Sequence, residues 1–294
     1  MRFATIARDR RPATVVARPE GLVDLQAMAG GPVPWGRALV AAWMDGDRSL
    51  VDLARRALDA PASAVPLIDP LHASFLPPVP DARQVLAVGL NYRSHCAEQH
   101  REPPARPMFF AKLVSALSPH GAPIPAWPVT SQLDYEGELA VVIGRGGRDI
   151  PPGFVADHVM GYTIANDVTA RDLQRDDRQW TRAKGLDGFC PMGPYLVTAD
   201  DVPDPQALRI RTWVDDEPRQ DGSTADMVFG IDALVHHATQ GLTLYPGDIL
   251  ITGTPAGVGL YRDPPAFLRP GNVVRIAIDG LGELVNPVVP PPGR

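Results

Sequence analysis

LDYEGELAVVIG, residues 133–144, carries two signals in one short segment. Its second half, ELAVVI (138–143), places apolar side chains at nearly every position, which predicts a strand buried on both faces. Its first half carries Glu136 and Glu138, and residues two apart on a strand point to the same face. Two such carboxylates repel each other and lose hydration unless a cation holds them. The alternative is a frayed strand end with both glutamates in water.

A third acid follows the next apolar segment, in GYTIANDVTARDLQ (161–174). Residues 160–165 predict a strand, and Asp167 lies at its end. Thr169 has the character of a helix N-cap with Asp172 as its capping-box partner, so we interpret Asp172 as a cap and not a ligand. Three carboxylates without a histidine favour a hard cation, Mg²⁺, Mn²⁺ or Ca²⁺, over Zn²⁺. The sequence therefore predicts a divalent-metal site made by Glu136, Glu138 and Asp167.

An acid–base pair is predicted in GLNYRSHCAEQ (89–99), where a strand gives way to a helix. The spacing of three places His95 and Glu98 on one helix face, within hydrogen-bond reach. A carboxylate that orients an imidazole makes a general base. The alternative is an ordinary surface pair. Cys96 points another way, and we do not expect it to act as a nucleophile.

Polar groups that could bind an anion lie in three further segments. Arg171 and Gln174 share one face of the helix after the third acid and are expected to grip a carboxylate, unless that face is simply solvated. Only two of the 28 basic residues are lysines, Lys112 and Lys184. A lysine retained among so many arginines suggests a site that needs a compact ammonium. Lys184 is expected in a loop, and Thr254 lies in a Gly-rich turn whose N–H groups and hydroxyl suit an anion.

The predicted organisation is a small N-terminal α/β domain (1–65), a Pro-rich linker (66–82) and a larger domain (83–294). Connections in the larger domain are turn-rich and lack the regular strand–helix alternation of a doubly wound sheet, which favours an α+β, β-rich class. Further elements are expected from hydrophobic periodicity as helices at 35–44, 49–60 and 231–242 and strands at 85–89, 208–214, 248–252 and 273–278.

Composition narrows the partners and the compartment. The formal net charge of −6, the pI near 5.6 and the 6% aromatic content argue against nucleic acid as the partner. No apolar run reaches the length of a membrane span, and residues 1–19 lack the apolar core of a signal peptide. The two cysteines make no disulfide framework, so we expect a cytoplasmic protein.

Taken together, the motifs resemble the fumarylacetoacetate hydrolase family, and in particular its bacterial members with a short N-terminal domain. The matching stretches cover about residues 83–288 and occur in the family's order: VGLNYRSHCAEQ, FFAK, LDYEGELAVVIG, GYTIANDVTARDLQ, QWTRAKGLDGFCPMGP, RQDGSTADMVF, GDILITGTPAGVG and LRPGNVVRIAIDGLGELVNPV. The resemblance implies a mixed β-sandwich roll, usually in a homodimer.

The resemblance also implies roles for the site residues. Glu136, Glu138 and Asp167 would bind Mg²⁺ or Mn²⁺, and His95 and Glu98 would form the acid–base dyad. The positions that match substrate contacts are Arg171, Gln174, Lys184 and Thr254, with Lys112 in the family's F-x-K stretch as a further one.

The leading functional expectation is hydrolysis of a carbon–carbon bond in a 2,4-diketo acid, an acylpyruvate or a deoxy-diketo sugar acid, through a metal-stabilised enolate. The dyad would activate water and Lys184 would stabilise the oxyanion. The same site would also suit a decarboxylase, an isomerase or a dehydratase of a 2-oxo acid, and a non-catalytic 2-oxo acid binder is a further alternative. HREPPARPM (100–108) is a candidate lid over the substrate.

Overall fold

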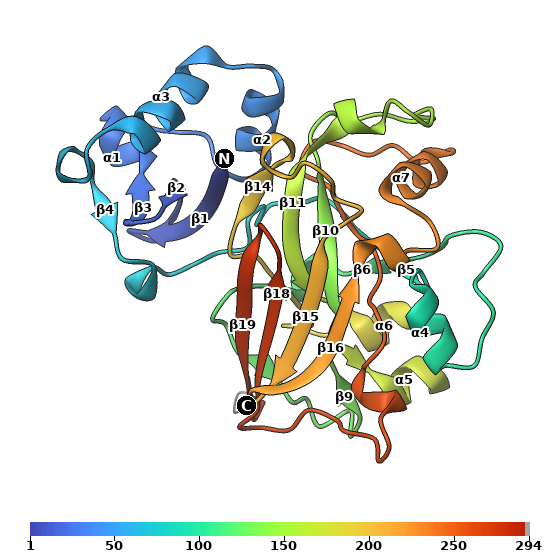
Figure 1. Cartoon of the computed structure of the whole chain (residues 1–294). Helices are drawn as coiled ribbons and strands as arrows, with labels where there is room; N and C mark the ends of the chain where they lie inside the picture. The colour runs from blue at the N-terminus through green and yellow to red at the C-terminus, as the bar shows by residue number, and fades with distance from the viewer. Residues whose placement is uncertain (292–294) are drawn as a thin grey trace.

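A 12-stranded sheet runs through the computed structural model, which describes residues 1–291. Its strands follow the order β4-β3-β2-β1-β14-β11-β10-β17-β5-β6, with β13 beside β11 and β7 beside β13 (Figure 1). Their bounds are β1 Arg2–Arg8, β2 Arg11–Arg18, β3 Gly21–Asp24, β4 Leu67–Ile68, β5 Val85–Gly89, β6 Met108–Lys112, β7 Leu117–Pro119, β10 Gly137–Ile143, β11 Val159–Asn166, β13 Cys190–Met192, β14 Leu196–Thr198 and β17 Ile249–Ile251.

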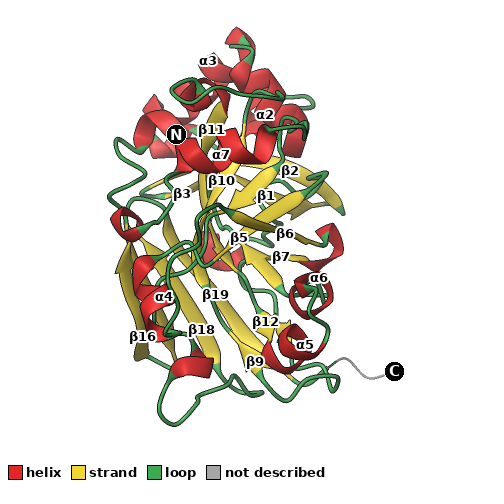
Figure 2. Ribbon diagram, turned by 90° about the vertical axis from the view of Figure 1, so that its right-hand side faces the viewer, coloured by secondary structure: helices red, strands yellow, loops and turns green. Residues whose placement is uncertain are grey.

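A second sheet of five strands packs on the first, in the order β16-β15-β18-β19-β8 (Figure 2). Its strands are β8 Ile124–Pro125, β15 Arg209–Val214, β16 Glu217–Ser223, β18 Val273–Ile278 and β19 Gly282–Val289. A two-stranded ladder joins β9 (Leu133–Asp134) to β12 (Thr169–Ala170). This strand-rich, mixed arrangement confirms the predicted α+β class, and β5, β10, β11, β15, β17 and β18 lie where hydrophobic periodicity predicted strands.

The helices are short and lie around the sheets. Their bounds are α1 Leu25–Ala29, α2 Gly36–Met44, α3 Arg48–Asp59, α4 Arg93–Glu98, α5 Arg171–Asp176, α6 Trp180–Lys184 and α7 Ile231–Thr239. Figure 2 shows α4 on one side of the strands and α5 and α6 on the other. Within residues 1–291, no helix combines the length and the apolar character needed to traverse a bilayer.

Strand β10 lies between β11 and β17, and all seven of its residues are buried. This is the double burial that the run of apolar residues predicts. The antiparallel register pairs Gly137 with Asn166, so the next positions outward are Glu136 and Asp167. The backbone N–H of Asp167 donates to the Glu136 carbonyl at 2.9 Å, which continues the ladder one step. Strand register therefore brings the third acid beside the first two.

The N-terminal strands continue the sheet of the larger domain. Strand β1 pairs with β14 through Arg2↔Val197 and Phe3↔Leu196. The Pro-rich segment supplies β4, and its Phe75 bridges to Ile6. The division into residues 1–65, 66–82 and 83–294 stays a prediction, and residues 292–294 of the last segment lie outside the described residues.

Two local predictions around the site were wrong. Thr169 does not cap a helix but pairs with Asp134 in the β9–β12 ladder, and α5 begins two residues later. Asp172 instead accepts hydrogen bonds from the Thr130 hydroxyl at 2.6 Å and from the Ser131 N–H at 2.8 Å, so it fixes the preceding loop. Lys184 was expected in a loop but ends α6. For Thr169, pairing with a distant segment overrides the local signal.

Candidate active site

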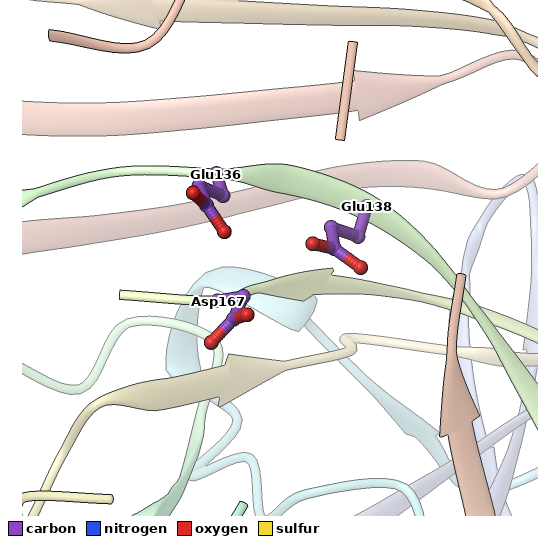
Figure 3. Close-up of side chains that lie close together, drawn as sticks. All are labelled: Glu136, Glu138 and Asp167. Carbon is purple, nitrogen blue, oxygen red and sulfur yellow. The ribbon is translucent and has the colours of Figure 1, made fainter. Parts of the chain in front are cut away.

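Glu136, Glu138 and Asp167 form one buried group of carboxylates. Each offers an oxygen atom within 4.8 Å of the other two, and their relative exposures are 5%, 1% and 1%. Figure 3 shows the three carboxyl groups turned toward one another, two from the β10 segment and one from the end of β11. The predicted metal ligands therefore do lie together.

Two lysines contact this carboxylate triad from different sides. The Lys184 ammonium donates to Glu136 Oε2 at 2.7 Å, to Asp167 Oδ2 at 2.6 Å and to Thr169 Oγ1 at 2.9 Å. Lys112 Nζ lies 2.6 Å from Asp167 Oδ1 and donates to the Phe189 carbonyl at 2.7 Å. Burial would lower the pKa of Lys184, but the charges of Asp167 and Glu136 raise it above its ordinary value. Lys184 therefore remains an ammonium.

Within residues 1–291, Glu138 is the member of the triad that no lysine or arginine side chain contacts as an ion pair. Its Oε2 accepts the Gly253 N–H at 2.6 Å. Burial, followed by the charges of Asp167 and Glu136, raises its pKa well above the ordinary value. Burial alone would also raise the pKa of Glu136, but Lys184 and Arg171 lower it overall. A divalent cation would supply the missing positive charge with hard oxygen ligands, so the triad fits such an ion.

The predicted dyad forms at the end of α4. His95 Nδ1 lies 2.5 Å from Glu98 Oε1, and Glu98 Oε2 accepts the Gly257 N–H at 2.8 Å. His95 is 6% exposed, so the pair is not the surface pair of the alternative interpretation. Because a carboxylate can only accept, the hydrogen of a neutral His95 lies on Nδ1, and Nε2 carries the lone pair.

Glu136 and Glu138 of the triad and His95 of the dyad line one cavity of about 500 Å³. Strand β5, α4, α5, α6 and the 3₁₀ helix η7 (Gly259–Tyr261) contribute to its wall. Its polar and aromatic lining residues are His95, Gln99, Arg101, Phe110, Gln132, Glu136, Glu138, Arg171, Gln174, Arg175, Trp180, Lys184, Thr254 and Tyr261. Aromatic rings flank the lysine side, where Phe110 and Trp180 meet edge to face at 5.3 Å. A concave site with convergent polar groups is the usual form of an active site.

Arg171 is tied into the structure by a residue that the motifs did not indicate. Its Nε donates to Asp134 Oδ2 at 2.8 Å, and a terminal nitrogen lies 2.6 Å from Glu136 Oε1. Asp134 is fully buried and also accepts the Gly259 N–H at 2.7 Å and the Leu260 N–H at 3.0 Å. Asp134 thus links a triad member, through Arg171, to η7 on another part of the wall.

The remaining predicted residues take different places. Gln174 lines the cavity and accepts from Arg171 Nη1 at 3.1 Å, which leaves its NH₂ group for a ligand. The Thr254 hydroxyl lines the cavity but donates to the Gly137 carbonyl at 2.9 Å and accepts from Gln220 at 2.8 Å. Lys112 was predicted to contact substrate, but its side chain is fully buried against Asp167 and does not line the cavity. Its compact ammonium neutralises the third acid.

Two further cavity residues were missed. Gln99 Nε2 lies 2.7 Å from His95 Nε2, and Gln99 Oε1 accepts from the Tyr261 hydroxyl at 3.2 Å. The helical spacing of four between His95 and Gln99 was a signal in the sequence for the first contact. No local signal connects Gln99 to Tyr261, because the two are far apart in the chain.

Comparison with known proteins agrees with this architecture. Residues 84–289 match the family model described as fumarylacetoacetate (FAA) hydrolase C-terminal. A mitochondrial oxaloacetate tautomerase from Bos taurus, FAHD2A, is 40% identical over 271 residues, which are 92% of this chain and 84% of that protein. A second mitochondrial oxaloacetate tautomerase, Fahd2a from Rattus norvegicus, is 43% identical over 248 residues, 84% of this chain and 78% of that one.

Solved structures show the same likeness over the whole chain. The fumarylacetoacetate hydrolase of Exiguobacterium antarcticum has a TM-score of 0.85 at 35% identity, over 99% of both chains. The maleylpyruvate hydrolase of Sphingobium sp. SYK-6, solved with manganese(II) and pyruvate, has a TM-score of 0.80 at 30% identity, over 99% of this chain and 100% of that one. The family predicted from the motifs is confirmed: the chain belongs to the fumarylacetoacetate hydrolase family.

Proposed function

We propose that the chain is a divalent-metal-dependent enzyme that moves a proton at the carbon next to the 2-oxo group of a dicarboxylic 2-oxo acid, as a keto–enol tautomerase or isomerase. The observation that carries the proposal is that a buried carboxylate triad and a His95–Glu98 dyad meet at one cavity, which Glu136, Glu138 and His95 line. The metal would be Mg²⁺ or Mn²⁺, held by Glu136, Glu138 and Asp167. The manganese complex of the maleylpyruvate hydrolase supports this assignment.

The named relatives support the substrate class. Three of their names concern oxaloacetate, maleylpyruvate and, for an isomerase from Mycobacterium marinum that is 32% identical over 99% of this chain, 2-hydroxyhepta-2,4-diene-1,7-dioate. All three compounds are acids with two carboxylates. Each is a 2-oxo acid or the enol of one. The tautomerases are also 40–43% identical to this chain over most of its length, whereas the fumarylacetoacetate hydrolase and the maleylpyruvate hydrolase are 35% and 30% identical. We therefore place proton transfer ahead of the carbon–carbon hydrolysis that the motifs first suggested.

The residues of the chain supply the remaining steps. When bound, the divalent cation supplies a Lewis acid that polarises the 2-oxo group. The free NH₂ group of Gln174 donates to the acid end of the substrate. The ammonium of Lys184 attracts the negative charge that develops on the 2-oxo oxygen. His95 Nε2 takes the proton from C3 of the keto form while Glu98 holds Nδ1–H, and the proton returns to oxygen to give the enol. The reverse direction gives the keto form.

A purified-protein assay tests this proposal. Keto–enol interconversion of oxaloacetate would be followed by absorbance, and exchange of its C3 hydrogen in D₂O by mass spectrometry, with Mn²⁺ and with chelator. Removing a general base costs about 10²–10⁴-fold in rate, so His95→Gln should lose that much. His72→Gln is the matched control, because the His72 side chain is 83% exposed. Metal-independent exchange, or full activity in His95→Gln, would refute the proposed mechanism.

Hydrolysis of a 2,4-diketo acid is the second candidate. The cavity volume of about 500 Å³ favours hydrolysis in one respect. A four-carbon acid does not fill the cavity, so there is room beside the dyad for the water molecule that hydrolysis needs. Mass spectrometry on a panel of acylpyruvates and diketo sugar acids decides between them. Cleavage to a 2-oxo acid and a second carboxylic acid would establish the hydrolase. Binding of these acids without turnover of any, in metal-loaded protein, would instead leave the non-catalytic binder.

We further propose that the protein is a cytoplasmic homodimer, as the family resemblance and the composition predicted. Light scattering coupled to size-exclusion chromatography measures its mass against the 31.6 kDa of one chain. A mass near that of one chain would contradict the dimer.

A further inference from the structure

The base nitrogen of the dyad is covered by a neighbouring amide. Gln99 Nε2 lies 2.7 Å from His95 Nε2, the nitrogen that carries the lone pair. The other nitrogen, Nδ1, is engaged by Glu98. A substrate carbon can reach the base only where Gln99 now lies. The reacting carbon must therefore displace the Gln99 amide from His95.

Two side chains on the cavity wall near Gln99 can donate hydrogen bonds, those of Tyr261 and Arg101. The Tyr261 hydroxyl donates to Gln99 Oε1 at 3.2 Å, and its ring meets the His95 ring edge to face at 6.3 Å. Arg101 follows Gln99 by two residues, after His100 in the left-handed conformation (φ 54°), and also lines the cavity. We call Gln99, Arg101 and Tyr261 the rim beside the base; their donors are an amide, a guanidinium and a hydroxyl group.

Charge on the wall distinguishes this rim from the rest of the cavity. Lys184 is paired with Glu136 and Asp167, and Arg171 lies against Asp134 and Glu136. Among residues 1–291, by contrast, Arg101 enters none of the ion pairs of the cavity wall. The remaining arginine of the wall, Arg175, pairs with Asp176 at 3.0 Å, so the Arg101 guanidinium is available to an anion from outside the protein.

Substrate geometry places an anion at this rim. This step rests on the proposed function, in which the 2-oxo end lies at the triad and C3 lies at His95 Nε2. In a four-carbon 2-oxo dicarboxylic acid, C3 is bonded directly to the distal carboxylate. That carboxylate must then lie next to His95 Nε2, where the Gln99 amide is displaced. A carboxylate accepts several hydrogen bonds, and those from a guanidinium are among the strongest.

We propose that Gln99, Arg101 and Tyr261 form a distal-carboxylate site that selects dicarboxylic over monocarboxylic 2-oxo acids. Entry of the distal carboxylate exchanges the Gln99–His95 contact for contacts to the substrate, so the base is uncovered when an acid of this class binds. An acid without the second carboxylate offers nothing to replace that contact. Discrimination thus comes from the same three residues that cover the base.

Binding of a matched ligand pair tests the inference apart from turnover. The pair is 3,3-dimethyl-2-oxobutanedioate and 3,3-dimethyl-2-oxobutanoate, which differ only in a carboxylate replaced by a methyl group. Neither has a hydrogen at C3, so neither is enolised. Isothermal titration of the Mn²⁺-loaded protein should show a preference for the dicarboxylate of about tenfold or more, since a hydrogen bond to a charged group is worth at least that factor.

Variants assign that preference to the rim. Arg101→Met should reduce it toward onefold, and Gln99→Leu and Tyr261→Phe should each reduce it several-fold. Arg106→Met is the matched control, because Arg106 lies in the same loop but lines a separate groove with α7. Equal binding of the two ligands by the wild type, or the same loss in Arg101→Met and Arg106→Met, would overturn the inference. A dicarboxylate preference without C3 exchange on oxaloacetate would overturn only the proposed function.

Discussion

Replacing Asp134 with Asn perturbs a junction between two parts of the cavity wall. The carboxylate is fully buried and accepts from Arg171 Nε, Gly259 N–H and Leu260 N–H at 2.7–3.0 Å. An asparagine keeps one accepting oxygen and turns an NH₂ group toward the remaining donors. It also leaves the buried Arg171 guanidinium with one carboxylate fewer. Arg171 stays charged in the variant, because a guanidinium is not deprotonated in proteins.

The expected loss in the free energy of unfolding is large for a substitution that replaces one oxygen atom by an NH₂ group. Breaking a buried ion pair by removing one partner costs about 3–5 kcal/mol, because it leaves a buried charge without compensation. Arg171 keeps its contact with Glu136 in the variant, so we expect Asp134→Asn to lower the free energy of unfolding by about 3 kcal/mol, the lower end of that range. The urea midpoint, compared at equal m-value, measures this.

A surface pair gives the matched control. Asp221 accepts two hydrogen bonds from Arg209 at 2.7 and 2.6 Å, but both side chains are more than half exposed. Exposed pairs contribute about 0–1 kcal/mol. Asp221→Asn should therefore shift the urea midpoint little. If Asp134→Asn and Asp221→Asn shift it equally, the argument that Asp134 holds Arg171 and η7 is wrong.

Three further predictions follow from other contacts. Burial and like charges raise the Glu138 pKa, so the metal-free Glu138→Gln variant should melt no lower than the wild type. Its Mn²⁺ affinity, measured by calorimetry, should fall tenfold or more, and an unchanged affinity would remove Glu138 from the metal site. Burial lowers the His120 pKa, so the stabilising contribution of His120 is present above the unfolded pKa of about 6.5 and is lost as pH falls. The urea midpoint should therefore decline more steeply below that pH in the wild type than in His120→Gln. Parallel pH profiles of the two proteins would contradict this. A methyl group on Gly89 would lie 2.5 Å from the Trp180 ring, so Gly89→Ala should lower the Tm and weaken substrate binding, whereas Gly31→Ala, in open space, should do neither.

Short-range periodicity predicted the parts of the site that lie on one element. Spacing of two on a strand placed Glu136 with Glu138, and spacing of three on a helix placed His95 with Glu98. In both cases the structure brings the side chains together. These relations are fixed by backbone geometry alone, so they can be deduced without the tertiary fold. Asp134 lies two residues before Glu136, so the same spacing of two also predicts that it shares a strand face with Glu136 and Glu138.

Contacts between distant segments were not deducible in this way. Thr169 has the local character of a cap, yet strand pairing with Asp134 decides its conformation. Lys112 was predicted to meet substrate, but its sequence position cannot show that its ammonium is buried against Asp167 and the Phe189 carbonyl. The pairing of β1 with β14 joins the N-terminal strands to the rest, and residues nearly 200 positions apart make that contact. Propensity gives way to packing at each of these positions.

The two ends of the cavity are built on supports of different rigidity. The triad lies on β10 and at the end of β11, two buried central strands whose register is fixed by burial of both faces. The rim residues lie in the turn that follows the six-residue α4 and on the three-residue η7. A change of length or sequence there leaves the sheet intact, whereas a change in β10 would shift the triad itself. The sheet therefore fixes how the 2-oxo end is held, and the rim is the part in which the choice of substrate, and of proton transfer or hydrolysis, can vary.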